Sequence, residues 1–110
     1  MAEFACAFSY TPEAWARLIA EPGDRTPAVR RTVEDAGGEL TALYYTLGEL
    51  GGLALFAAPD ADTAAGIGLV IRASGAFERV TIQQLTRAAD FVSVLDGARA
   101  ASPGYRRPGD

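Results

Sequence analysis

The stretch that decides the fold runs from Gly37 to Asp60 and reads GGELTALYYTLGELGGLALFAAPD. The paired glycines at its start are typical of a helix end, and the run of threonine, leucine and tyrosine that follows is typical of a strand. A glycine-rich turn then leads into a second apolar run, and Pro59-Asp60 is typical of a helix start. The stretch therefore predicts a β-hairpin preceded and followed by helices.

Patterns on both sides of this hairpin complete the predicted order of elements. Residues 3–9 alternate large and small side chains, which indicates a first strand. Thr11-Pro12 and Thr26-Pro27 each join a capping hydroxyl to a proline suited to the first helical position, so each predicts a helix start. Three further elements follow: a helix over about 61–73, a strand over about 77–85 and a last helix capped by Thr86.

The resulting order, β-α-β-β-α-β plus a C-terminal helix, predicts an α+β, ferredoxin-like domain with a four-stranded antiparallel sheet. Its helices would cover one face only, yet residues 52–58 are apolar on both faces, and such a strand must be covered on both. We therefore expect a homodimer in which a second copy covers the open face, so that the two facing sheets enclose a small barrel-like cavity. The domain would span residues 1–98, and residues 99–110 would form a flexible tail.

The composition of the chain limits the kinds of partner that the protein can bind. The chain has 110 residues, the length of a single domain. A domain of this size buries roughly 65% of the surface that its unfolded chain exposes. Its net charge of −4, with no basic run longer than a pair, argues against nucleic acid. No apolar run approaches the ~20 residues needed to span a bilayer, so no membrane partner is expected. A single cysteine and the lack of signal-peptide blocks at the N-terminus fit a cytoplasmic protein.

The absent residue types limit the chemistry further. The chain has no histidine and no lysine, and all ten basic residues are arginine, which does not exchange protons near neutral pH. A His-based triad, a His-ligated metal, a Schiff base and a Walker lysine are therefore excluded. One cysteine cannot build a thiolate zinc site, so no metal and no cofactor are expected. Any reaction would have to use carboxylates, tyrosines, arginines, hydroxyls or one thiol.

Several short motifs carry a family resemblance over about Phe8–Leu95. They are Gly37-Gly38-Glu39-Leu40, Tyr44-Tyr45-Thr46-Leu47-Gly48-Glu49, Ala58-Pro59-Asp60, Ser74-Gly75, Thr81 and Leu85-Thr86. In this order and spacing they resemble the GYD domain family, uncharacterised bacterial proteins, and the resemblance implies the dimeric α/β-barrel form of the fold. The family is named for Gly-Tyr-Asp, whereas the turn here reads Gly48-Glu49-Leu50-Gly51. The family tyrosine thus falls on Leu50 and the aspartate on Gly51.

Three residues of the hairpin are candidates for catalysis. Tyr44 and Tyr45 are neighbours on a strand, so they must point to opposite faces of the sheet. A phenol in an enclosed cavity can orient or protonate a substrate oxygen, but both rings can equally serve to pack the sheet. Glu49 can act as a base at a cavity mouth or simply be a solvated carboxylate in a turn.

Three residues on one strand are candidates for ligand binding. Arg79, Thr81 and Gln83 share the open face of the sheet, where a covered polar group must find a partner. That partner would be a ligand, with arginine holding a carboxylate or enolate oxygen, or an ion pair across the dimer. Cys6, placed mid-strand between alanines, is either an inert small hydrophobe or a reactive thiol.

Two functions stay open at this point. One is a cofactor-independent small-molecule enzyme or binder that uses the cavity between the sheets, by analogy with other dimeric α/β-barrel families. The other is a non-catalytic assembly or ligand-sensing module, which the altered turn favours. An apolar pocket of several hundred Å³ with a few convergent polar groups would favour the first function.

Overall fold

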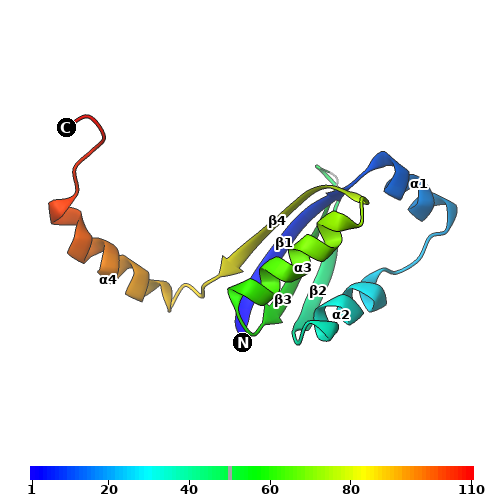
Figure 1. Cartoon of the computed structure of the whole chain (residues 1–110), viewed down its shortest axis with the longest axis horizontal. Coiled ribbons are helices and arrows are strands. Elements are labelled where there is room, and N and C mark those ends of the chain that lie inside the picture. The colour runs from blue at the N-terminus through cyan, green and yellow to red at the C-terminus, as the bar shows by residue number, and fades with distance from the viewer. Residues whose placement is uncertain (50) are drawn as a thin grey trace.

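The computed structural model describes residues 1–49 and 51–110 (Figure 1). Its elements are β1 (Ala2–Tyr10), α1 (Pro12–Ala20), α2 (Thr26–Asp35), β2 (Glu39–Thr46), β3 (Gly51–Ala58), α3 (Ala61–Ala73), β4 (Phe77–Leu85), α4 (Phe91–Ala101) and the short 3-10 helix η1 (Ser102–Gly104). The order matches the prediction, with the first helical region divided into α1 and α2.

The four strands form one antiparallel sheet in the order β2-β3-β1-β4. This is the ferredoxin-like arrangement, in which the first and third strands are central and the hairpin strand β2 lies at an edge. Helix α2 packs on β2, and α3 packs on β3 and β4, as Figure 1 shows. The predicted fold class is confirmed.

The core lies between the sheet and the helices on one face. Alternate residues of the two central strands point into it, because successive side chains of a strand point to opposite faces. Phe4 of β1 and Phe56 of β3 stack with ring centroids 5.5 Å apart. The buried core residues are Phe4, Cys6, Phe8, Tyr10, Ala54, Phe56 and Ala58 from the sheet, with Val33, Ala64 and Ile67 from the helices.

Two helix starts follow the predicted capping chemistry. The Thr11 hydroxyl accepts a hydrogen bond from the Ala14 backbone N–H at 3.2 Å, and proline occupies the first turn of α1. The Asp60 carboxylate accepts one from the Thr63 N–H at 2.7 Å, which also lowers the pKa of Asp60. Each cap satisfies a backbone donor that has no partner within its own helix.

The start of α2 differs from the prediction. Thr26 is the first helical residue and not the cap, and the N-cap residue Arg25 makes no side-chain capping bond. Instead the Asp24 carboxylate accepts a hydrogen bond from the Thr26 N–H at 2.9 Å. The helix ends as predicted, since Gly37 adopts φ +88°, a left-handed conformation that glycine reaches without a steric penalty.

Helix α3 contains two glycines in different surroundings. A Cβ built on Gly68 would lie 2.7 Å from the Cδ1 of Ile82, so the missing side chain lets α3 approach β4 closely. A Cβ built on Gly66 would meet nothing within 4 Å. Close packing therefore explains one of the two glycines, and nothing in the structure explains the other.

The prediction that Thr86 caps the last helix is wrong. Residues 87–90 form a turn in which the Asp90 N–H donates to the Arg87 carbonyl at 2.9 Å, so α4 begins only at Phe91. A threonine caps a helix only when helical residues follow it directly, and here they do not. No residue of α4 is buried, and Figure 1 shows the helix leading away from the sheet after β4.

Helix α4 extends to Ala101, past the boundary expected at residue 98, and η1 follows it directly. The flexibility expected of residues 99–110 stays a prediction. Within the described ranges, no helix is both long enough and apolar enough to cross a membrane.

Candidate functional site

The sheet face opposite the helices carries side chains that are exposed or half-buried. Because even-numbered residues of β1 and β3 enter the core, odd-numbered ones occupy this open face. The strand register aligns them into two rows across the sheet, Tyr44–Leu53–Ala7–Thr81 and Ala42–Leu55–Ala5–Gln83.

The centre of this open face is low and apolar. Ala5 and Ala7 on β1 add only a methyl group above the backbone, whereas Leu53 and Leu55 rise on the β3 side. Polar side chains follow on β4, where Arg79 lies opposite Ser9. The face is therefore a shallow apolar trough with one polar border, an arrangement that suits an apolar molecule with a polar group.

The structure brings together some of the candidate residues but not all. Arg79, Thr81 and Gln83 are successive exposed residues on the same face of β4, as predicted. Tyr44 is on the same face, but on β2 at the opposite edge of the sheet. Three strand spacings of about 4.8 Å separate the two edges, roughly 14 Å. Within one chain, Tyr44 and the β4 residues therefore rise from opposite edges of the face, with β3 and β1 between them.

Tyr45 points to the other face, as its position beside Tyr44 requires. Its hydroxyl is hydrogen-bonded to that of Tyr10 at 3.1 Å, and its ring lies against those of Phe8 and Trp15. Burial, followed by the hydrogen bond with Tyr10, raises the pKa of Tyr45 well above its usual value. A phenol this reluctant to ionise, engaged with a neighbouring phenol, has the features of a packing residue.

The surroundings of Glu49 and Cys6 fit the non-catalytic alternative for each residue, a solvated carboxylate in a turn for Glu49 and an inert small hydrophobe for Cys6. Glu49 is exposed in the turn after β2, and its backbone carbonyl accepts a hydrogen bond from the Thr46 hydroxyl at 2.6 Å. Cys6 is buried in the core, and burial raises the pKa of its thiol, with a smaller opposing effect from Arg72. The protonated thiol is a poor nucleophile and behaves as a small hydrophobe.

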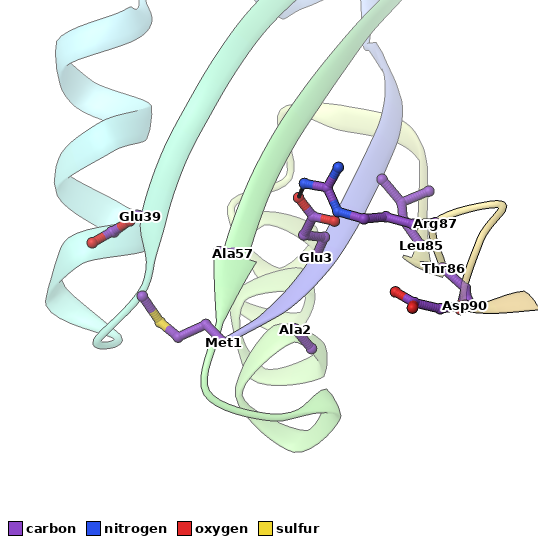
Figure 2. A pocket seen from close by; sticks show the side chains of 9 residues that line it. All are labelled: Met1, Ala2, Glu3, Glu39, Ala57, Leu85, Thr86, Arg87 and Asp90. Carbon is purple, nitrogen blue, oxygen red and sulfur yellow. Dashed lines mark hydrogen bonds and ion pairs between the residues drawn. The ribbon is translucent and has the colours of Figure 1, made fainter.

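A broad hollow of about 550 Å³ lies at the end of the sheet near the N-terminus (Figure 2). Glu3 and Arg87 form an ion pair across it at 3.3 Å, and both side chains are largely exposed. Figure 2 shows the carboxylates of Glu39 and Asp90 on either side, well away from this pair. The charged groups do not converge on one point, and an exposed pair contributes about 0–1 kcal/mol, so this hollow has the character of ordinary surface.

A second cavity, of about 310 Å³, lies on the helix side between α2, α3 and the sheet. Sequence patterns gave no expectation of it. The one available signal was the small size of Cys6 and Ala54, which face the helices at the centre of the sheet and leave space above them. Within the described chain, no three His, Cys, Asp or Glu side chains are grouped so that they could hold a metal ion.

The strand order, the single layer of helices and the open face define a ferredoxin-like α+β domain. The family model of the GYD domain matches residues 4–95, most of the chain, and the chain belongs to the GYD domain family. No curated protein matches the chain. Leu50, on which the family tyrosine falls, lies outside the described residues.

Proposed function

We propose that the chain forms a homodimer through its open sheet face and binds a small organic molecule between the two sheets without a cofactor. The observation that supports this most directly is the open face itself, where Leu53 and Leu55 of a central strand lack any covering element among the described residues. Burying a leucine side chain fully is worth about 1.5–3 kcal/mol. In a two-fold dimer every such contact occurs twice.

The dimer has room for a ligand beside the trough along Ala5 and Ala7. In a two-fold dimer with parallel strands, Leu53 and Leu55 of one copy would lie over this trough of the partner and set the separation of the sheets, and the remaining space would extend toward the β2 and β4 edges. The space would be apolar with polar groups at its border, the usual character of small-molecule sites.

Two-fold symmetry would bring candidate residues from both copies into one site. A two-fold axis parallel to the strands exchanges the two edges of the sheet, so β2 of one copy comes to lie over β4 of the other. Tyr44 of one copy would then face Arg79, Thr81 and Gln83 of its partner. The arginine would hold a carboxylate or enolate oxygen, and the phenol would orient the substrate or donate a proton to it.

A second function, a non-catalytic assembly or ligand-sensing module, is favoured by one observation. The turn reads Gly48-Glu49-Leu50-Gly51 and so lacks the tyrosine and aspartate for which the family is named. A chain that keeps the fold but loses these groups can keep the assembly without the chemistry. The two functions predict the same dimer, and a pure assembly module differs from a binder, a sensor or an enzyme in that its cavity holds no ligand.

Thiol cross-linking tests the composite site. In a Cys6→Ala background, Tyr44→Cys combined with Thr81→Cys should give a covalent dimer with a bifunctional methanethiosulfonate reagent that spans about 10 Å, the usual separation of two facing sheets, which is too long for a direct disulfide. Because the reagent can also join the two positions within one chain, only the covalent dimer is counted. The matched control combines Tyr44→Cys with Glu34→Cys, on exposed helix α2, and should give no more covalent dimer than Tyr44→Cys alone. Equal trapping of both pairs would overturn the proposed arrangement.

Native mass spectrometry of the purified protein tests the ligand. A dimer with extra mass that disappears on denaturation supports a binder or an enzyme. A dimer without extra mass supports the assembly module, and a monomer contradicts both forms of the proposal.

A further inference from the structure

We infer that the cavity between α2 and α3 is a second binding site, contained within a single chain, for a small apolar carboxylic acid. It lies on the opposite side of the sheet from the proposed dimer face and does not depend on that dimer.

The cavity exists because the two helices rest on different strands. Helix α2 packs against β2, whereas α3 packs against β3 and β4, which leaves an opening above the centre of the sheet. Small residues deepen the opening, with Cys6 and Ala54 in its floor and Ala28 in the wall formed by α2. Larger side chains at these positions would fill it.

The lining of this cavity is mostly apolar. An apolar cavity costs stability because its lining atoms lack contacts, and an apolar ligand restores those contacts. The volume of about 310 Å³ exceeds the roughly 150 Å³ that admits benzene and reaches the lower end of the range for small-ligand pockets. Its larger apolar wall and floor residues include Phe8, Val29, Leu43, Phe56, Ile67 and Ile71.

The polar groups of the lining indicate the ligand's head group. The hydroxyls of Thr32 and Ser74 donate to carbonyls of their own helices, those of Ala28 at 3.2 Å and Ile71 at 2.6 Å. Arg25 also lines the cavity, and its exposed guanidinium makes no hydrogen bond or ion pair with any described residue. A free guanidinium beside an apolar cavity selects a carboxylate, which it can bind through two parallel hydrogen bonds.

Cys6 provides a direct test, because it is the single cysteine of the chain and forms part of the cavity floor. We would measure the rate at which methyl methanethiosulfonate, a small uncharged thiol reagent, modifies Cys6 with increasing octanoate. Octanoate should slow the modification at least tenfold at saturation. Octan-1-ol, which has the same chain without the charge, should protect Cys6 at higher concentrations.

Variants test the apolar cavity and the guanidinium of Arg25 separately. Ala54→Leu and Ala28→Leu fill the cavity from the floor and from the wall, and each should weaken octanoate binding by more than tenfold, measured by calorimetry. The control Ala73→Leu adds the same side chain to an exposed position of α3 and should leave binding unchanged. Using two filling variants keeps the test decisive if one of them fails to fold.

Arg25→Ala should weaken octanoate binding roughly three- to tenfold while leaving octan-1-ol unaffected, since exposed ion pairs are weak. Arg30→Ala, on the adjoining helix α2 but outside the lining, is its control. The inference is overturned if octanoate neither binds nor protects Cys6, or if both filling variants bind it as well as the unmodified chain. Protection should persist in a variant whose dimer face is disrupted, which separates this site from the proposed dimer cavity.

Discussion

The hydroxyls of Tyr10 and Tyr45, 35 positions apart in the chain, are hydrogen-bonded at 3.1 Å and join the end of β1 to the edge strand β2. The strands are not neighbours, because β3 lies between them. The phenols therefore reach across β3, where Gly52 has no side chain to obstruct them and the ring of Phe8 covers the glycine. This contact fixes the edge strand to the core from the helix side.

The pair should show energetic coupling. Tyr10→Phe and Tyr45→Phe should each lower the free energy of unfolding by about 1 kcal/mol, because each leaves the other hydroxyl without its partner. The double variant should lose less than the sum of the two, by about 0.5–1 kcal/mol. Urea unfolding of the four proteins measures this coupling. Strictly additive losses would show that the hydrogen bond contributes nothing to stability.

Tyr45 should also make stability depend on pH in the alkaline range. Its pKa in the folded state is raised above the usual value of about 10, so the folded chain holds this proton more tightly than the unfolded chain. The associated stability is complete below about pH 10 and is lost as the pH rises through the raised pKa. Tyr45→Phe should reduce this loss in alkaline urea titrations, whereas Tyr44→Phe, on the opposite face, should keep the original slope.

The open face should determine the oligomeric state. Leu55→Arg places a charge at the centre of the face, opposite Ala5 and Ala42, and should convert the proposed dimer to a monomer in sedimentation velocity. Leu69→Arg is the matched control, since Leu69 is 64% exposed on α3, and it should not change the mass. An unchanged mass for Leu55→Arg would rule out a dimer through this face.

Arg79 should matter for ligand retention and not for folding. Its side chain is exposed, so Arg79→Ala should change the free energy of unfolding by no more than about 0.5 kcal/mol. The fraction of dimer that carries a co-purified molecule in native mass spectra should fall. Arg17→Ala, an exposed arginine on α1, serves as the control. If bound mass survives undiminished in Arg79→Ala, this arginine has only a structural role.

The two glycines of α3 should respond differently to alanine. Gly66→Ala should raise the free energy of unfolding by about 0.5–1 kcal/mol, since alanine is the better helix former and its methyl group would meet no other atom. Gly68→Ala should be less stabilising than Gly66→Ala, because Ile82 must move to admit the new methyl group. We expect a difference of about 1 kcal/mol between the variants in thermal or urea unfolding. Equal gains would show that α3 is not held tightly against β4.

The secondary-structure elements that the sequence predicted correctly are those with a clear pattern among residues close together in the chain. The strands Glu39–Thr46, Gly51–Ala58 and Phe77–Leu85 and the helix Ala61–Ala73 follow from periodicity and from capping residues next to one another in sequence. The start of α4 was misplaced, since a threonine is a cap only if the following residues turn helical, and four of them form a turn instead.

The candidate site was partly predictable for the same reason. Alternation along a strand was enough to place Arg79, Thr81 and Gln83 on one face and to separate Tyr44 from Tyr45. It does not give the distance between strands, so the separation of Tyr44 from the β4 residues emerged only from the sheet order.

What the sequence by itself determined is therefore the set of elements, their order and the face to which each side chain points, because these depend on neighbours within a few positions. Only the tertiary structure decided that Tyr10 meets Tyr45 and that α2 and α3 leave a cavity above Cys6. Both depend on how elements far apart in the chain are spaced once packed. Such spacing results from the volumes of all the packed side chains together and leaves no local pattern in the sequence.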